Sequence, residues 1–225
     1  MYKLVLFDVP NLLLADSKDV SEYVSESIRN IYGRVVPVDL GKYWGWTSQD
    51  IAEDVLLQSH MDNDEINGKL KRYMEDLYYT YYNVAGHDRI VLLAGARGLL
   101  AELWKRNVQL GIVSGEAEKI TRFKVEKAGI RGFFKTGYFG EAGKTYSDII
   151  ETALKGIESE LDIDKDGILV VAGSVRLIRD AKEAGLAALG VANVNCSEAE
   201  LRAAGADLTV KSIKERKRIA DFATE

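Results

Sequence analysis

Asp8, Ser114 and Gly173 stand directly after three apolar runs of the sequence. Asp8 offers a carboxylate, and Ser114 offers a hydroxyl that can donate or accept a hydrogen bond. In an open parallel sheet, ligands gather at the carboxyl ends of the strands. We therefore expect the chemistry of this protein at these three strand ends.

The elements that must position these residues alternate between short apolar strands and longer helical patterns. The expected strands are Lys3–Phe7, Gln109–Val113, Gly167–Ala172, Ala187–Val191 and Leu208–Val210. Such near-continuous apolar runs are typical of strands covered on both faces. The alternation predicts an α/β fold, a Rossmann-like three-layer core with a parallel sheet between two layers of helices.

Residues 15–88 differ from the rest of the chain because no strand pattern interrupts them. Apolar residues at helical spacing mark three expected helices, Ser17–Tyr32, Ser48–His60 and Asp64–Asn83. The expected N-caps are Ser48 for the second helix and Asp62, Asn63 or Asp64 for the third. The sequence thus predicts an all-helical cap domain, 15–88, inserted after the first strand into a core domain of residues 1–14 and 89–225.

Composition and charge narrow the expected partners and location. The 225 residues carry a net charge of -5, which gives no electrostatic footprint for nucleic acid or for an anionic membrane. The basic run Lys211–Arg218 contains Glu215 and fits a solvated helix face. A signal-peptide pattern and a bilayer-length apolar stretch are both missing from the sequence, so we expect a cytoplasmic protein. The single cysteine, Cys196, excludes an intrachain disulfide and a zinc cluster.

A series of segments in a fixed order covers nearly the whole chain. These segments are Lys3–Asp8, Gly45–Ile51, Ala94–Leu103, Gly111–Gly115, Gly143-Lys144 and Ala184–Leu208. Their order and spacing resemble the haloacid dehalogenase superfamily, and within it the phosphoglycolate-phosphatase-like members that carry a helical cap. The resemblance implies the same α/β core and a hydrolase-type active site at Asp8.

The first motif of that family reads Asp-x-Asp-x-Thr. The resemblance implies that Asp8 is the nucleophile, which carries the phosphoryl group as an aspartyl phosphate. The second Asp of the family is the general acid and base, and here Pro10 takes its place, while Leu12 replaces the Thr. Proline has neither an ionisable side chain nor a backbone N–H. The acid–base role is therefore absent from this loop.

The second and third motifs of the family bind and balance the transferring phosphoryl group. By resemblance, the Ser114 hydroxyl and the Gly115 backbone N–H bind phosphate, and Lys144 supplies the balancing cation. The expected catalytic residues are thus Asp8, Ser114 and Lys144, and the expected phosphate-binding residues are Ser114, Gly115 and Lys144.

The fourth motif of the family, Gly-Asp-x-x-x-Asp, holds magnesium. Gly173 and Leu177 stand where these two acids belong, so Asp8 is the one carboxylate left at the expected ligand positions. Magnesium prefers near-octahedral oxygen coordination with one or two carboxylates. We expect no cofactor, or magnesium with Asp8 as a weak ligand if the family activity is retained.

Four substitutions at positions 10, 12, 173 and 177 lead to our first hypothesis, a catalytically impaired protein of this fold. It would act as a binding or regulatory module for a small phosphorylated molecule or a protein partner, as a monomer or homodimer. The apolar replacements suggest a site that is packed shut.

Two enzymatic alternatives remain open. An active small-molecule phosphatase would use Asp8 with an acid from elsewhere, and the nearest candidates, Glu116 and Glu141, are expected to face solvent. A metal-independent 2-haloacid dehalogenase would also lack the second Asp of the first motif. Such relatives, however, retain the Thr that Leu12 replaces.

Overall fold

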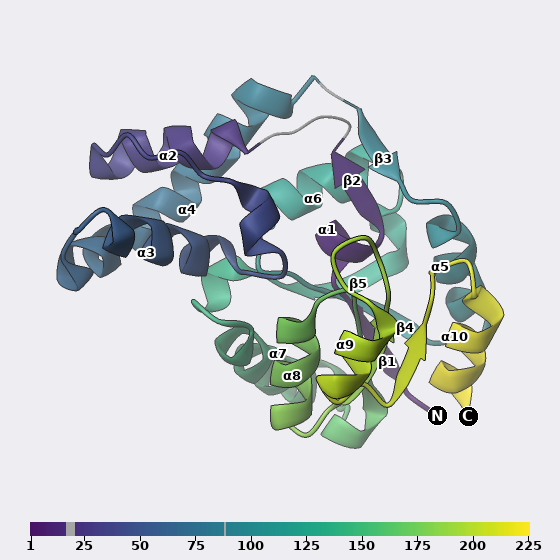
Figure 1. Ribbon diagram of the computed structural model, residues 1–225. Coiled ribbons are helices and arrows are strands. Elements are labelled where there is room, and N and C mark those ends of the chain that lie inside the picture. The colour runs from purple at the N-terminus through teal and green to yellow at the C-terminus, as the bar shows by residue number, and fades with distance from the viewer. Residues whose placement is uncertain (17–20, 88) are drawn as a thin grey trace.

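A six-stranded parallel sheet forms the centre of the computed structural model, which describes residues 1–16, 21–87 and 89–225 (Figure 1). The strand order is β5-β4-β1-β6-β7-β8, and every neighbouring pair is parallel. The strands are β1 (Leu4–Phe7), β4 (Gln109–Val113), β5 (Phe134–Tyr138), β6 (Ile168–Ala172), β7 (Ala187–Val191) and β8 (Leu208–Val210). The predicted parallel α/β sheet is confirmed.

Helices cover both faces of this sheet because the side chains of its buried strands alternate between the faces. Val5 and Phe7 pack against α5 (Ala96–Lys105), α6 (Glu118–Lys127) and α10 (Arg216–Thr224). Leu4 and Leu6 point to the opposite face, which is covered by α7 (Tyr146–Leu161), α8 (Val175–Glu183) and α9 (Glu198–Ala203). These two apolar clusters make the predicted three-layer core.

The cap helices lie beside the carboxyl ends of the strands (Figure 1). They are α2 (Glu22–Tyr32), α3 (Ser48–Gln58) and α4 (Asn63–Ala85), with a 3-10 helix, η1 (Leu40–Tyr43). Their apolar faces form a third cluster, and Ala117 and Ile120 beside the start of α6 belong to it. The cap therefore shares buried surface with the core, and the domain boundaries at 15 and 88 remain a prediction.

Two short strands join the cap to the core. A single helical turn, α1 (Val9–Leu12), follows Asp8 and leads into β2 (Leu14–Asp16). Strand β2 pairs antiparallel with β3 (Ile90–Leu92), through which the chain returns from the cap. The expectation that no strand occurs in the segment from residue 15 is wrong at its start, since a three-residue strand is too short to give an alternating pattern.

The predicted N-cap of the second cap helix, α3, is wrong by one residue. Its N-cap is Thr47, not Ser48, because the Thr47 hydroxyl accepts the backbone N–H of Asp50 at 3.0 Å. For α4, Asp62 is the N-cap, one of the three predicted residues. The first cap helix begins at Glu22, and residues 17–20 of its predicted span lie outside the described residues.

One core strand is missing from the sequence prediction. Edge strand β5 contains Lys135 and Gly137, residue types that are depleted in strands, and it pairs with β4 across a register shift. Short 3-10 turns, η2 (Arg131–Phe133), η3 (Gly140–Ala142) and η4 (Lys165–Gly167), lie before or after core strands. Because β5 lacks a continuous apolar run, its sequence does not predict a strand.

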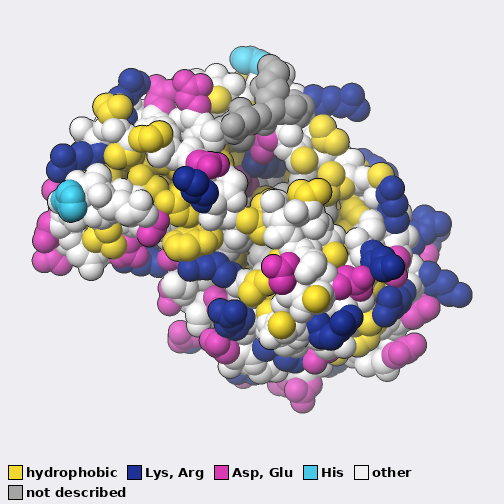
Figure 2. Space-filling model, viewed as in Figure 1, with side chains coloured by type: hydrophobic (Ala, Val, Ile, Leu, Met, Phe, Trp, Pro, Cys, Tyr) yellow, Lys and Arg dark blue, Asp and Glu magenta, His cyan; other side chains and the backbone are white. Residues whose placement is uncertain are grey.

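Charged side chains of both signs are interspersed on the face shown in Figure 2. The lysines and arginines of the basic run Lys211–Arg218, which leads into α10, are exposed, and Arg218 pairs with Glu215 at 3.3 Å. The two termini lie side by side, where the Tyr2 N–H donates to the Ala223 carbonyl at 3.0 Å (Figure 1). Among the helices of the described residues, none combines the length and the apolar character that a membrane span requires.

Candidate active site

Asp8 follows β1 directly and is fully buried. The Asn11 amide donates to both carboxylate oxygens, at 3.1 and 3.2 Å. Burial raises the pKa of Asp8 to about 7, against an ordinary value of 3.8, and the charge of Glu116 adds to this rise, while the Asn11 bonds oppose it. Near neutral pH, a large fraction of Asp8 is therefore protonated, whereas a carboxyl nucleophile must be ionised.

The structure brings Ser114 and Gly115 to the same sheet edge as Asp8, since β1 and β4 are parallel neighbours. The Ser114 hydroxyl accepts the Glu116 N–H at 3.1 Å and shares a hydrogen bond with Thr121 at 3.2 Å. The Gly115 N–H donates to the Tyr146 hydroxyl at 3.2 Å. Both predicted phosphate-binding groups thus have hydrogen-bond partners within the protein.

Lys144 points to the cap instead. Its ammonium lies 2.7 Å from a carboxylate oxygen of Glu53 on α3. Among the ion pairs of the described residues, Lys144 has none with Asp8. The predicted balancing cation is therefore neutralised by an acid of the cap.

Both replaced positions of the first motif, 10 and 12, lie in α1. Pro10 lies in the first turn of α1, where the absence of an N–H costs no helical hydrogen bond. Leu12 is buried among the side chains that face α5 and α10. The first motif has thus become part of a helical turn and of the hydrophobic core.

Gly173 and Leu177 lie on the other side of the site. The Gly173 carbonyl accepts the Asn193 amide at 2.7 Å and the Trp44 indole N–H at 3.1 Å. A Cβ at Gly173 would lie 2.8 Å from the Asn193 amide nitrogen. Leu177 is fully buried against α7 and β6. We expected the apolar replacements to pack the site shut, but Leu12 and Leu177 belong to two separate core clusters on opposite faces of the sheet and do not fill one pocket.

The donors around Asp8 do not fit magnesium. A magnesium ion needs near-octahedral oxygen coordination, and its protein ligands are carboxylates. Within the described residues, no group of three or more His, Cys, Asp or Glu side chains is placed to hold a metal ion. Asp8 stands without the second carboxylate that Gly173 or Leu177 would have to supply.

A segment of the cap, Trp44–Ser48, covers this site, and we call it the cap loop. Four hydrogen bonds fix the cap loop and the start of α3 to core backbone. The Trp44 indole donates to Gly173, the Ser48 N–H to Gly115, the Thr47 hydroxyl to Lys144 and the Gln49 amide to Gly140. All four acceptors are backbone carbonyls, so these four contacts do not depend on the conformation of core side chains.

Two glycines let the cap loop approach the core this closely. A Cβ at Gly115 would lie 2.8 Å from the Thr47 Cα, and one at Gly45 would lie 2.5 Å from the Ser174 Cβ. Thr47 is fully buried by this contact. The cap loop therefore occupies the space next to Gly115, the glycine that is predicted to bind phosphate.

Ion pairs surround the cap loop. Asp50 lies 2.6 Å from Arg176, and the Arg176 guanidinium stacks over the Trp46 ring at 3.7 Å. Arg176 is half-exposed and follows Ser174 on α8. Together with the pair between Glu53 and Lys144, these contacts connect α3 to helix α8 and to the loop that contains Lys144.

The Gly45 contact can be tested by substitution. Gly45 and Gly33 have nearly the same left-handed backbone, with φ of +74° and +69°, but a Cβ at Gly33 would have no atom within 4 Å. We expect Gly33→Ala to cost about 1 kcal/mol from backbone strain alone. Gly45→Ala adds the clash with Ser174, so it should cost roughly 2–3 kcal/mol. Urea unfolding measures both, and equal costs would contradict the close packing of the cap loop.

A buried charge network that was not predicted from the sequence lies beside the site. Lys124 is almost fully buried, with its ammonium 2.6 Å from Glu116 and 2.9 Å from Asp16. The Tyr81 hydroxyl of the cap donates to Asp16. The expectation that Glu116 faces solvent is therefore wrong. The available signal was the position of Lys124, four residues after Ile120 on the apolar face of a helix.

Glu141, the other acid considered, is exposed as expected and accepts the Glu118 N–H. Of the two, only Glu116 lies in the protein interior near Asp8, and its charge contributes to the raised pKa of Asp8. The structure thus joins Asp8, Ser114, Gly115 and Glu116 at one sheet edge and places Lys144 at the cap contact.

Comparison with known proteins agrees with this architecture. A family model described as haloacid dehalogenase-like hydrolase matches residues 5–191. The chain belongs to the haloacid dehalogenase-like hydrolase family. A phosphoglycolate phosphatase from Vibrio vulnificus (strain CMCP6) is 24% identical over 192 residues, 84% of this chain and 83% of that protein.

Solved structures share the haloacid dehalogenase-like fold at low identity. A predicted phosphatase from Clostridium acetobutylicum superposes with a TM-score of 0.70 at 20% identity, covering 98% of this chain and 99% of that one. CbbY from Rhodobacter sphaeroides, solved in complex with phosphate, gives a TM-score of 0.70 at 21% identity over 96% of each chain. The likeness extends over cap and core together.

Proposed function

We propose that this haloacid dehalogenase-like protein is a catalytically impaired, phosphoglycolate-phosphatase-like member that acts as a binding or regulatory module. The observation that carries the proposal is the contact between the cap loop and the core. Thr47 lies where a side chain on Gly115 would be, next to the groups that would bind a phosphoryl group.

The electrostatics at Asp8 support the same proposal. Asp8 has a pKa of about 7 because it is buried, and no cation pairs with it among the described ion pairs. Lys144 is held by Glu53, and the loop has no proton donor at Pro10. Loss of one acid–base group alone typically lowers the rate by about 10²–10⁴.

Partner and cofactor follow from this proposal. A module of this kind would bind a small phosphorylated molecule or a protein, as a monomer or homodimer in the cytoplasm, without nucleic acid. It would work without magnesium, since the donors at Asp8 do not fit the ion. Phosphatases of the family typically use magnesium, so a response to this ion is informative.

Assays of the purified protein with magnesium test the proposal directly. With p-nitrophenyl phosphate and phosphoglycolate as substrates, we expect turnover at least about a hundredfold below the ~1–10 s⁻¹ of ordinary enzymes. Any residual rate should be the same in Asp8→Asn. A rate near 1 s⁻¹ that disappears in Asp8→Asn would overturn the proposal.

A second candidate function is an active phosphatase with a displaced acid. It is favoured by one observation, the burial of Glu116, which raises the pKa of that carboxyl, in electrostatic contact with Asp8. In this case Glu116→Gln and Asp8→Asn would both abolish phosphate release, while Glu141→Gln would leave it unchanged. The ion pair with Lys124 and the hydrogen bond from Thr121 count against this function, because they already engage both oxygens of Glu116.

A further inference from the structure

The groups that are predicted to bind phosphate already have protein oxygens as partners. The Gly115 N–H donates to the Tyr146 hydroxyl at 3.2 Å, and the Ser114 hydroxyl shares a hydrogen bond with that of Thr121, also at 3.2 Å. Tyr146 and Thr121 lie on the core helices α7 and α6, and both are buried. These two partners therefore belong to the core and do not move with the cap.

Glu53, the partner of the third predicted group, is charged and belongs to the cap. Its carboxylate oxygen lies 2.7 Å from the Lys144 ammonium, the distance at which a lysine also binds a phosphate oxygen. The two side chains are partly exposed, with 32% of Lys144 and 23% of Glu53 accessible. Because solvent reaches both ends of this ion pair, an incoming anion can replace the carboxylate.

The backbone holds Lys144 close to the predicted phosphate site. The Thr47 hydroxyl donates to the Lys144 carbonyl, and Thr47 packs against Gly115, where an added Cβ would lie 2.8 Å from the Thr47 Cα. A lysine carries its charge on a flexible four-carbon stem. The ammonium that now points to α3 can therefore turn toward Gly115 once Glu53 releases it.

We propose that the Glu53 carboxylate is an internal competitor of the ligand, which holds Lys144 at the cap in the free protein. A small phosphate monoester displaces this carboxylate when it binds to Ser114, Gly115 and Lys144. At pH 7 the phosphate carries about 1.5–2 negative charges, against one on the carboxylate, so it competes well for the lysine. This competition rests on the proposed function, in which the site binds a phosphorylated molecule without turning it over. Ligand binding is thereby coupled to release of the cap.

A second ion pair of α3 provides a matched contrast. Asp50 lies 2.6 Å from Arg176 of α8, so this pair also fixes the cap helix to the core. Arg176 is not one of the predicted phosphate-binding residues, and its guanidinium is stacked over the Trp46 ring. Breaking this pair loosens the cap but leaves Lys144 with Glu53.

Calorimetric titration with inorganic phosphate, in the absence of magnesium, tests the competition. We expect Glu53→Gln to bind phosphate at least about fivefold more tightly than the wild type, because the lysine loses its charged partner. Glu53→Ala, which cannot hydrogen-bond to the lysine, should show the same gain. Asp50→Asn should remain within about twofold of the wild type. Adding Lys144→Met to Glu53→Gln should abolish the gain.

Three results would overturn the proposal. The first is a phosphate affinity of both Glu53 variants equal to that of the wild type, or no saturable binding by them at about 50 mM phosphate. The second is an equal gain in Asp50→Asn, which would show that loosening the cap is sufficient. The third is a gain that survives the loss of Lys144. Thermal unfolding checks that each variant is folded.

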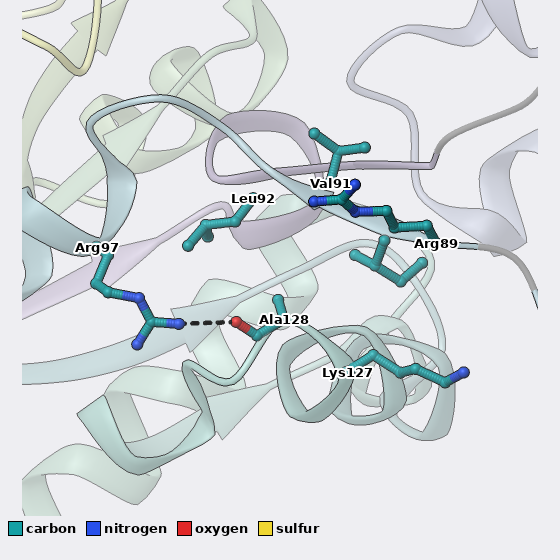
Figure 3. A pocket seen from close by; sticks show the side chains of 7 residues that line it. Arg89, Val91, Leu92, Arg97, Lys127 and Ala128 are labelled. Atoms are coloured by element: carbon teal, nitrogen blue, oxygen red, sulfur yellow. Dashed lines mark hydrogen bonds between the residues drawn. The ribbon is translucent and has the colours of Figure 1, made fainter.

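Phosphate bound elsewhere on the protein would not respond to these substitutions. A cleft of about 410 Å³ beside β3 is lined by Arg89, Arg97 and Lys127 (Figure 3). Arg97 donates to the Ala128 carbonyl at 3.0 Å and Lys127 to that of Gly86 at 3.0 Å, so these cations are directed to separate backbone groups. Any binding there would be equal in all variants and is thus separated from binding at the cap contact.

Failure of the competition and failure of the proposed function give different results. Turnover by the wild-type protein that disappears in Asp8→Asn would overturn the proposed function, whatever the phosphate affinities are. A protein without turnover whose Glu53 variants bind phosphate no better than the wild type would overturn the competition alone.

Discussion

The Asp8→Asn variant is expected to lose a pH dependence of stability that the wild-type protein has. Asp8 has a pKa of about 7 in the folded protein because it is buried, against 3.8 in an unfolded chain. This difference corresponds to about 4 kcal/mol of destabilisation once the carboxyl is ionised in both states. Asparagine has nearly the same shape and never ionises, so the variant avoids this cost.

The sign of the effect follows from proton binding. Between the two pKa values the folded state holds a proton that the unfolded state has released, so the free energy of unfolding falls as the pH rises. Well below pH 3.8 Asp8 is protonated in both states and contributes no such penalty. Between pH 5 and 8 the wild type should lose about 2–3 kcal/mol through Asp8 alone.

Urea unfolding at pH 5 and pH 8 measures this quantity as the difference between Asp8→Asn and wild type. Comparing two pH values removes the constant effect of the changed hydrogen bonds to Asn11. Asp164→Asn is a matched control, because Asp164 is exposed and makes no capping hydrogen bond, and it should follow the wild type. Parallel pH profiles for Asp8→Asn and wild type would mean that Asp8 is ionised normally.

Lys124→Met should destabilise the protein by roughly 3–5 kcal/mol. Burial alone would lower the pKa of Lys124, but the carboxylates of Glu116 and Asp16 raise it above its usual value, so the side chain stays charged. Removing this ammonium leaves two buried carboxylates close together with no cation between them. The effect should reach the cap as well, because Tyr81 of α4 donates to Asp16.

Denaturant unfolding compares this variant with a control, Lys155→Met, which breaks an exposed ion pair with Glu151 of similar N–O distance, 2.7 Å. The control should lower the free energy of unfolding by less than about 1 kcal/mol. Adding Glu116→Gln and Asp16→Asn to Lys124→Met should restore more than half of the loss, since no buried charge is then unpaired. A Lys124→Met variant as stable as Lys155→Met would show that water reaches the network.

Much of the fold could be predicted because its signals are local. Three strands, Gln109–Val113, Ala187–Val191 and Leu208–Val210, have the ends that their apolar runs indicated. The capping residue of α3 and the edge strand β5 were missed, because a one-residue shift of a cap and a strand with Lys and Gly leave weak local patterns.

In the candidate site, too, some residues could be placed from the sequence and others could not. Asp8, Ser114 and Gly115 could be placed together because parallel strands end at one edge of a sheet. The position of Lys144 could not, since its partner Glu53 is 91 residues away in the chain. Glu116 was placed wrongly because its burial depends on the ion pair with Lys124, whose ammonium also lies over the Tyr81 ring of the cap.

The sequence by itself determined that the acids expected at positions 10, 173 and 177 are absent, since the identity of a side chain does not depend on folding. Only the tertiary structure decided what surrounds Asp8 in their absence. The cap loop lies on Gly115, and Asp8 is shielded from water. Both facts arise from contacts between segments far apart in the chain, and the desolvation of Asp8 is the sum of all of them.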